Sequence, residues 1–155
     1  MNVLANDGVS KNCVLKLEEN GFRVIQDKVE QEELADYINS ESIEVLLVRS
    51  ATKVRKDLID SCENLKIIGR GGVGMDNIDV SYAKKKGIHV INTPAASSIS
   101  VAELVFSHLF SCVRSLHISN REMPLDGDKD FKKLKKNYSG GSELKGKTLG
   151  VVGFG

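Results

Sequence analysis

Short apolar runs alternate with amphipathic helical patterns along the first part of the chain, and this alternation leaves few possible folds. Apolar runs typical of strands begin near residues 3, 22, 45, 66 and 88, a spacing of about twenty residues. Each gap holds one helical pattern, which is the crossover connection that parallel strands require. We therefore predict a parallel sheet with helices on both faces, the helices lying over about 11–20, 31–40, 56–62 and 79–86.

The predicted helices have recognisable ends. Ser10 is a candidate N-cap of the first helix, and Asp79 is a candidate N-cap of the fourth. Gly21 and Gly87 directly follow the first and fourth helical patterns, where glycine commonly ends a helix. Five strands that alternate with helices in this way predict a flavodoxin-like doubly wound α/β domain over residues 1–98.

A different pattern begins downstream of the fifth strand. Ser100 and Glu103 match a capping box, and the helix they would open, over 100–118, is apolar around much of its circumference. Such a helix is expected to be buried or to pack against two partners. The polar, basic stretch 123–146 is predicted as a loop that holds at most one short helix, and 148–152 is predicted as a strand.

Composition excludes several classes of protein. Hydrophobic residues make up 41% and charged residues 28% of the 155 residues, which is ordinary for a globular chain. Lys and Arg number 22 against 21 Asp and Glu, so the net charge of +1 gives no reason to expect nucleic acid as a partner. No apolar run reaches the roughly 20 residues of a membrane span, and the N-terminus does not resemble a signal peptide. We expect a cytoplasmic protein that binds no membrane.

The cysteines suggest neither a metal site nor a disulfide framework. The chain has three cysteines, Cys13, Cys62 and Cys112, so they cannot all pair in disulfides. No two of them lie at a spacing typical of metal ligands. Each has apolar neighbours, so all three are predicted to be small buried hydrophobic residues in a reducing compartment.

A glycine-rich segment, 69–74, directly follows the fourth predicted strand. Glycine allows the backbone to approach a ligand and to present amide groups to an anion. Arg70 lies within this segment, and Arg49 and Ser50 end the preceding strand at the same sheet edge, where ligands of open α/β sheets bind. This pattern indicates a carboxylate or phosphate site. A tight turn with solvated arginines explains it about equally well.

The remaining motifs are weaker. Gly153 and Gly155 follow a predicted strand and match the opening of a dinucleotide-binding fingerprint, although a chance turn would give the same pattern. The lysines between 129 and 136 are better explained as a solvated loop than as phosphate ligands. The three histidines have no acid at an obvious spacing and are predicted to be structural or surface residues: His89, His108 and His117.

Several motifs occur together in one order along the chain. They are 48-VRSATKV-54, 68-IGRGGVGMDNID-79, 90-VINTP-94, 97-SSISVAEL-104 and 143-ELKGKTLGVVGFG-155. In this order and spacing the chain resembles the D-isomer-specific 2-hydroxyacid dehydrogenases, and within that family its phosphoglycerate dehydrogenase branch. The resemblance covers essentially the whole chain.

The resemblance implies a two-domain enzyme that closes a cleft around NAD and a small 2-hydroxy acid. Residues 1–98 would form the substrate domain, and residues 99–155 would contribute the first helix, basic loop and first strand of an incomplete Rossmann NAD-binding domain. The helix at 100–118 would also pack across a homodimer interface.

The resemblance also suggests roles for individual residues. Arg49 and Ser50 would contact the phosphate of the substrate or neighbouring groups, and the amides around Gly71 and Gly72 would hold its carboxylate. Arg70 completes the expected substrate-binding set. Three residues would contact the cofactor: Val73, Gly153 and Gly155.

The family's catalytic Arg, Glu and His lie beyond this stretch, so no residue here is assigned as catalytic and no metal is expected. The chain is expected to be the inactive N-terminal portion of an enzyme that oxidises 3-phosphoglycerate to 3-phosphohydroxypyruvate with NAD, the first step of serine biosynthesis. Two alternatives stay open. One is a related dehydrogenase that acts on glyoxylate, lactate or a similar acid, and the other is a non-catalytic dimerising or binding module.

Overall fold

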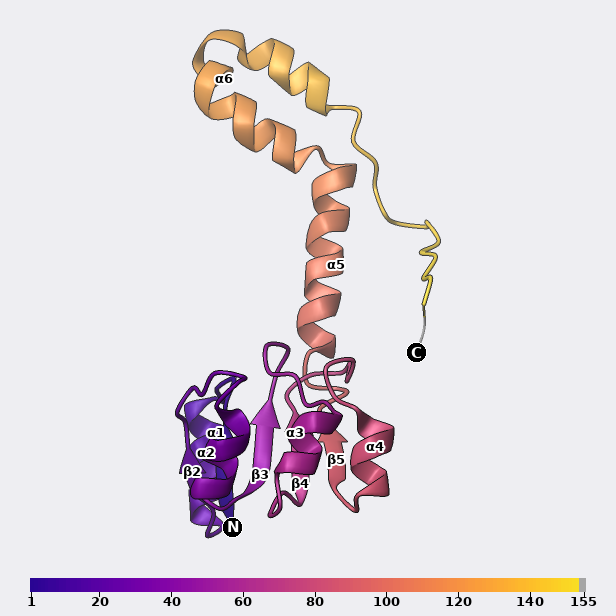
Figure 1. Cartoon of the computed structure of the whole chain (residues 1–155). Coiled ribbons are helices and arrows are strands. Elements are labelled where there is room, and N and C mark those ends of the chain that lie inside the picture. Colours follow the sequence, from indigo (N-terminus) through magenta and orange to yellow (C-terminus); the bar gives the residue numbers. More distant parts are fainter. Residues whose placement is uncertain (154–155) are drawn as a thin grey trace. The chain divides into compact units, whose positions relative to one another are not determined.

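Five parallel strands form one sheet in the order β2-β1-β3-β4-β5 (Figure 1). The computed structural model describes residues 1–153. The chain divides into two units, Met1–Ser97 and Ser98–Gly155, and the sheet belongs entirely to the first. The strands are β1 (Asn2–Ala5), β2 (Arg23–Ile25), β3 (Ile43–Val48), β4 (Ile67–Arg70) and β5 (His89–Asn92). This topology confirms the flavodoxin-like α/β fold expected for this part of the chain.

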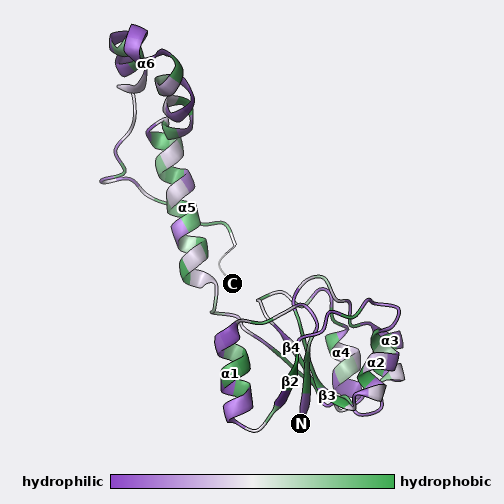
Figure 2. Cartoon of the chain, turned by 90° about the vertical axis from the view of Figure 1, so that its left-hand side faces the viewer, coloured by the Kyte–Doolittle hydropathy of each residue, from purple (hydrophilic) through white to green (hydrophobic). Residues whose placement is uncertain are grey.

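Four helices connect these strands, and they cover the two faces of the sheet unequally. They are α1 (Lys11–Glu19), α2 (Leu34–Ser40), α3 (Lys56–Ser61) and α4 (Val80–Lys85). Figure 2 shows α1 on one side of the sheet and α2, α3 and α4 on the other. Parallel sheets are stable only when their apolar faces are covered. The side with three helices covers more of the sheet and therefore contains most of the core. The largest fully buried side chains include Leu4, Leu34, Ile38, Leu46 and Ile68.

Most of the predicted helix ends are confirmed. The Ser10 hydroxyl accepts a hydrogen bond from the amide of Cys13 at 3.2 Å, and Gly21 and Gly87 both adopt a φ of +80° directly after a helix. Asp79 was expected to cap α4, but its side chain makes no capping bond there. Its carboxylate instead accepts from the Arg55 guanidinium at 3.1 Å and from the Lys56 amide, at the start of α3, at 3.2 Å.

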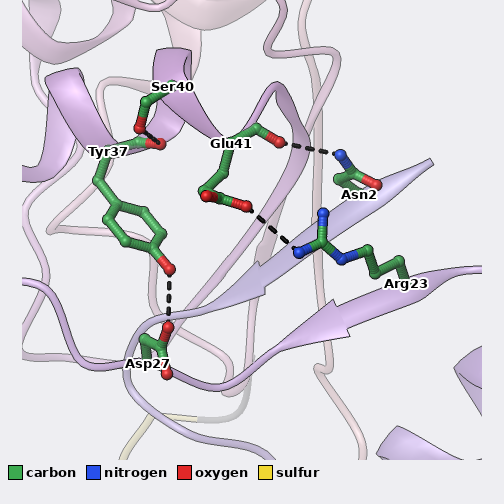
Figure 3. A network of polar contacts seen from close by, with 6 residues as sticks. All are labelled: Asn2, Arg23, Asp27, Tyr37, Ser40 and Glu41. Atoms are coloured by element: carbon green, nitrogen blue, oxygen red, sulfur yellow. Dashed lines mark hydrogen bonds and ion pairs between the residues drawn. The ribbon is translucent and has the colours of Figure 1, made fainter.

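A group of polar contacts fastens the end of α2 to the sheet (Figure 3). The Glu41 carboxylate pairs with Arg23 at the start of β2, with 3.3 Å between Nη2 and Oε2. The Glu41 carbonyl accepts from the Asn2 side chain at 2.9 Å, and the Tyr37 hydroxyl donates to Asp27 at 2.7 Å. These contacts fix α2 across β1 and β2.

The second unit consists of α5 (Ser98–Val113) and α6 (Leu116–Tyr138), and two expectations about the helix 100–118 were wrong. The single helix 100–118 is broken at Ser115, whose φ of +53° is left-handed. Because α5 begins at Ser98, Ser100 lies inside the helix and does not form the predicted capping box. The helix is also not buried within this chain, since Ile99 is 76% exposed and Val101 is 55% exposed.

The stretch 123–146 is largely helical, because α6 continues to Tyr138. Pro124 lies inside the helix, and Asp130 interrupts it with non-helical angles of φ −120° and ψ 27° (Figure 1). The Tyr138 hydroxyl donates to the Glu122 carboxylate and so ties the two arms of α6 together. Lysine and leucine favour helix strongly enough to continue it on both sides of the interruption.

The predicted strand 148–152 does not form. A strand is stabilised by hydrogen bonds to a neighbouring strand, and this segment pairs with none of the described residues. No single helix in residues 1–153 is long and apolar enough to cross a membrane, although α5 and α6, bent by 57° at their break, pass that test by length and composition when taken together.

Candidate functional site

A cavity of about 630 Å³ opens where β1, β3, β4 and β5 end. Its volume lies within the range of small-molecule sites, which is about 300–1,000 Å³. Parallel pairing places Val48 opposite Arg70, and Arg70 opposite Asn92, so the ends of three strands meet at one edge. The cavity therefore lies at the carboxyl ends of the strands, where the sequence predicted a ligand site.

Arg49 and Arg70 both line this cavity, as does Gly71. Neither arginine forms an ion pair with an acid of residues 1–153. The Nε of Arg70 is buried and has no hydrogen-bond partner there. A buried cationic donor without a partner is costly, and an anion in the cavity would relieve that cost. The residues present therefore fit a carboxylate or a phosphate.

Glycine at two positions shapes the cavity. A Cβ at Gly72 would lie 1.6 Å from Nη1 of Arg70, so the guanidinium rests directly against the Gly72 backbone. A Cβ at Gly69 would lie 2.7 Å from Cδ2 of Leu47, which extends over β4 toward Ile91. Gly72 thus leaves room for the Arg70 side chain and Gly69 for the Leu47 side chain, and both of these residues line the cavity.

The backbone amides of the glycine-rich loop are partly engaged. The Gly71 amide donates to the Val48 carbonyl at 2.8 Å, and the Gly72 amide donates to the Arg70 carbonyl at 3.0 Å. Within the described part of the chain, the next two amides along the loop, those of Val73 and Gly74, donate no hydrogen bond. The amides free to receive a carboxylate therefore lie just beyond the two glycines.

A second cavity of about 520 Å³ lies beside the first, on the β2 side of the Arg49 loop. Arg49 lines both cavities, and Ser50 lines the second. Lys28 and Gln26, which follow β2, also line it. Lys28 was not among the expected site residues, because its proximity to Arg49 depends on the β2-β1-β3 strand order.

A partly buried polar network beside the Arg49 loop was also missed. Asp7 follows β1, and its carboxylate accepts from the amides of Arg49 and Thr52 and from the Thr52 hydroxyl. Burial alone would raise the pKa of Asp7, but these hydrogen bonds outweigh burial and lower it. In the sequence, Asn6-Asp7-Gly8 looked like an ordinary turn at the end of a strand.

Val73, in the loop that follows β4, lies at this edge, because it is bonded to Asn92, which lines the first cavity. Val73 is 52% exposed, and its carbonyl accepts from the Asn92 side chain at 2.7 Å. Gly153 belongs to the second unit, where it follows a segment that is not a strand. Gly155 lies outside the described residues.

The remaining candidates are confirmed as surface or core groups, with some corrections. The lysines of α6 and the three histidines are exposed, although the lysines lie on a helix rather than on the predicted loop. Cys62 is buried as expected, but Cys13 is only partly buried and Cys112 is exposed, because α5 is not covered within this chain. Residues 1–153 contain no group of three or more metal-ligating side chains.

A model of the catalytic domain of D-isomer-specific 2-hydroxyacid dehydrogenases matches residues 3–143. The chain belongs to this family. Curated relatives include a hydroxypyruvate reductase of Thermotoga maritima, which is 46% identical over 99% of this chain and 48% of its own length. The D-3-phosphoglycerate dehydrogenase of Methanocaldococcus jannaschii is 43% identical over 99% of this chain and 28% of its own length. The chain thus spans about half the length of the first relative and less than a third of the second.

Solved structures of D-2-hydroxyacid dehydrogenases and related reductases share the fold. The 3-phosphoglycerate dehydrogenase of Entamoeba histolytica, solved with NAD⁺, is 29% identical with a TM-score of 0.61, over 74% of this chain and 39% of that one. An acyclic imino acid reductase (Bsp5), in complex with NADPH and D-Arg, is 28% identical with a TM-score of 0.67, over 79% of this chain and 40% of that one. These dehydrogenase-like structures confirm the α/β architecture of the first unit.

Proposed function

We propose that this chain is the substrate-binding N-terminal part of an NAD-dependent D-3-phosphoglycerate dehydrogenase. The observation that carries the proposal is the pair of arginines, Arg49 and Arg70, that border one cavity without an acidic partner among the described residues. A substrate with a carboxylate and a phosphate supplies one anion for each end of such a site. Several relatives named D-3-phosphoglycerate dehydrogenase, 36–43% identical, support this choice.

We assign the two anions to different parts of the edge. Arg49 and Ser50, which meet at the second cavity, would hold the phosphate. Arg70, which lines the first cavity, and the loop around Gly71 and Gly72, through its Val73 and Gly74 amides, would hold the carboxylate. A planar guanidinium can bind either anion through two parallel hydrogen bonds. The 2-hydroxyl of the substrate would then lie between the two anionic ends.

NAD is the cofactor proposed for the whole protein, where it accepts the hydride from the substrate. The residues described here build at most one side of its site: Val73 is accessible, whereas the strand that would lead into Gly153 is not formed. We propose that Val73, Gly153 and Gly155 contact NAD in the complete enzyme; the similar 3-phosphoglycerate dehydrogenase of Entamoeba histolytica was solved with NAD⁺ bound.

The proposed organisation assigns residues 1–98 to a substrate domain and 99–155 to the start of the NAD-binding domain. Along α5, large apolar side chains are exposed, among them Leu104, Phe106 and Phe110. Exposed apolar surface of this kind is typical of a protein–protein interface. We propose that α5, within the 100–118 segment, pairs with a second copy in a cytoplasmic homodimer. A strictly monomeric protein in light scattering would contradict this assignment.

A hydroxypyruvate reductase is the second candidate function. The Thermotoga relative with this name is 46% identical and is covered over a larger share of its length than the phosphoglycerate dehydrogenases. Hydroxypyruvate lacks the phosphate, so it would need only one of the two proposed anion sites. Glyoxylate and lactate are further non-phosphorylated substrates of this type.

Steady-state kinetics on the protein expressed from its whole reading frame tests the proposal. The assay compares 3-phosphohydroxypyruvate, hydroxypyruvate and glyoxylate as acceptors of hydride from NADH, with NADPH as the alternative donor. We expect kcat/KM to be highest for the phosphorylated substrate with NADH. Higher kcat/KM for hydroxypyruvate would establish the second candidate instead, and no turnover of any of these acids would favour a non-catalytic binding module.

A further inference from the structure

The Arg49–Thr52 segment carries both proposed phosphate ligands. Most of its side chains are exposed, whereas its backbone is held by hydrogen bonds at both ends. Arg49, Ser50 and Ala51 are exposed, and the segment belongs to no helix or strand. Thr52 at its end is only 4% exposed. An exposed loop of this kind is normally mobile, so a fixed position for Arg49 requires contacts to its backbone.

Asp7 supplies those contacts from the end of β1. One carboxylate oxygen accepts from the Arg49 amide at 2.6 Å and from the Thr52 amide at 3.1 Å. The other accepts from the Thr52 hydroxyl at 2.7 Å. The carboxylate thus binds both ends of the loop at once, and bonds to a charged acceptor are about twice as strong as neutral ones. The described residues place no cation against it, so its charge is balanced by donors of the loop alone.

Asn77 restrains the same loop from the opposite side. Its side-chain amide donates to the Arg49 carbonyl at 2.8 Å and to the Thr52 carbonyl at 2.7 Å. Asp7 therefore holds the amides, and Asn77 holds the carbonyls, of the same two residues. Asn77 also lies in the loop that follows β4, so it links the Arg49 loop to the Arg70 loop.

We infer that Asp7, together with Asn77, is a positioning residue that presents Arg49 and Ser50 to the anionic end of the substrate. This inference rests on the proposed function and adds to it a residue that lines both cavities but whose carboxylate is engaged by donors of the Arg49 loop. Holding the loop before substrate arrives removes the entropy cost of ordering it during binding. Loss of the restraint should therefore weaken binding and leave the chemical step unchanged, because the reacting carbon lies outside this loop.

The test uses four single variants of the protein expressed from its whole reading frame. Asp7→Asn removes the charge, and Thr52→Val removes the hydroxyl without changing the shape of the side chain. Thr52→Ser restores the hydroxyl and serves as the conservative rescue. Asp60→Asn is the matched control. This substitution also removes a carboxylate that accepts from a hydroxyl, that of Tyr82, but Asp60 lines neither cavity.

We expect Asp7→Asn and Thr52→Val to raise KM for 3-phosphohydroxypyruvate about tenfold, with kcat within about twofold of wild type. Thr52→Ser and Asp60→Asn should leave both constants unchanged. A general structural defect would instead lower the active fraction, and hence kcat, at constant KM. Wild-type KM in both Asp7→Asn and Thr52→Val, or a fall in kcat alone, would overturn the inference.

A readout without turnover keeps the two proposals separable. If the wild-type protein turns over none of the acids, the proposed function fails, and binding of inorganic phosphate is then measured by calorimetry. Phosphate affinity about tenfold weaker in Asp7→Asn than in wild type and Asp60→Asn would still support the positioning role. Equal affinity in all three proteins, or no phosphate binding by wild type, would overturn it.

Discussion

The backbone of Gly72 lies against the guanidinium of Arg70, so that a methyl group on Gly72 would lie 1.6 Å from Nη1 and 2.7 Å from Cζ. The φ of Gly72 is +152°, an angle that residues with side chains rarely adopt. The clash is with the end of a flexible side chain, not with backbone. A substitution at Gly72 should therefore move Arg70 within the cavity before it disturbs the fold.

Gly72→Ala should reduce substrate affinity with only a modest loss of stability. Displacement of Arg70 removes one charged contact, so we expect KM for the preferred 2-oxo acid to rise roughly tenfold or more. The strained φ should cost about 1–3 kcal/mol of unfolding free energy. Gly140→Ala is the control, because a Cβ there meets nothing within 4 Å. Unchanged KM in Gly72→Ala would show that the observed place of Arg70 does not matter for binding.

Arg49→Gln should distinguish phosphorylated from non-phosphorylated substrates. If Arg49 binds the phosphate, its loss removes a charge-assisted hydrogen bond, worth about 1.5–3 kcal/mol, from only one of the two substrates. We expect kcat/KM to fall roughly 10- to 100-fold for 3-phosphohydroxypyruvate and less than about threefold for hydroxypyruvate. Arg23→Gln is the control, because Arg23 is an exposed arginine at the start of β2 that lines neither cavity. Equal losses for both substrates would mean that Arg49 binds the carboxylate instead.

The sequence was a good guide to this edge of the sheet where its signals are local. Arg49 and Arg70 each directly follow an apolar strand pattern, and parallel strands bring such positions together. Asp7 has no comparable signal, because its partners Arg49 and Thr52 are 42 and 45 residues away and meet it only when β1 pairs with β3. Its role is a property of strand order, not of local sequence.

The second unit shows the opposite problem. The polar, basic and glycine-bearing composition of 123–146 suggested a loop where α6 forms. The segment 148–152 has strong strand preference but no neighbouring strand among the described residues. Strand propensity expresses how well a residue fits a pleated, paired surface, and it cannot form a strand without that surface.

The contribution of Asp7 to stability should depend on pH. Its pKa is lowered in the folded protein, mainly by the Thr52 hydroxyl and the loop amides acting against burial, so the folded state favours the ionised form. The stabilisation is present above the unfolded value of about 3.9 and is lost as the pH falls through the lower folded value. Urea midpoints of wild type and Asp7→Asn should therefore differ at pH 7 and converge once the pH falls below the lowered pKa of Asp7. A constant difference across this range would contradict the assignment.

Cys62 should be unreactive in the folded protein. It is 5% exposed, and burial raises the pKa of its thiol to about 11. The thiolate is the nucleophile, so little of it exists at neutral pH. Iodoacetamide followed by peptide mass spectrometry should show Cys62 alkylated in urea and protected without it. Alkylation at equal rates in both conditions would mean that the α3 end of the core opens readily.

The hydrogen bond between Tyr138 and Glu122 should hold the two arms of α6 together at neutral pH. The Tyr138 hydroxyl donates to Glu122, and this bond raises the pKa of Tyr138 to about 12, because the ionised phenol would face a carboxylate. A raised pKa means that the stabilisation is complete below the unfolded value of about 10 and is lost as the pH rises through about 12. Tyr138→Phe removes the bond at every pH. Comparison of amide exchange across 116–138 at pH 7 should therefore show faster exchange in Tyr138→Phe than in wild type, and equal exchange would mean that the contact does not hold the arms together.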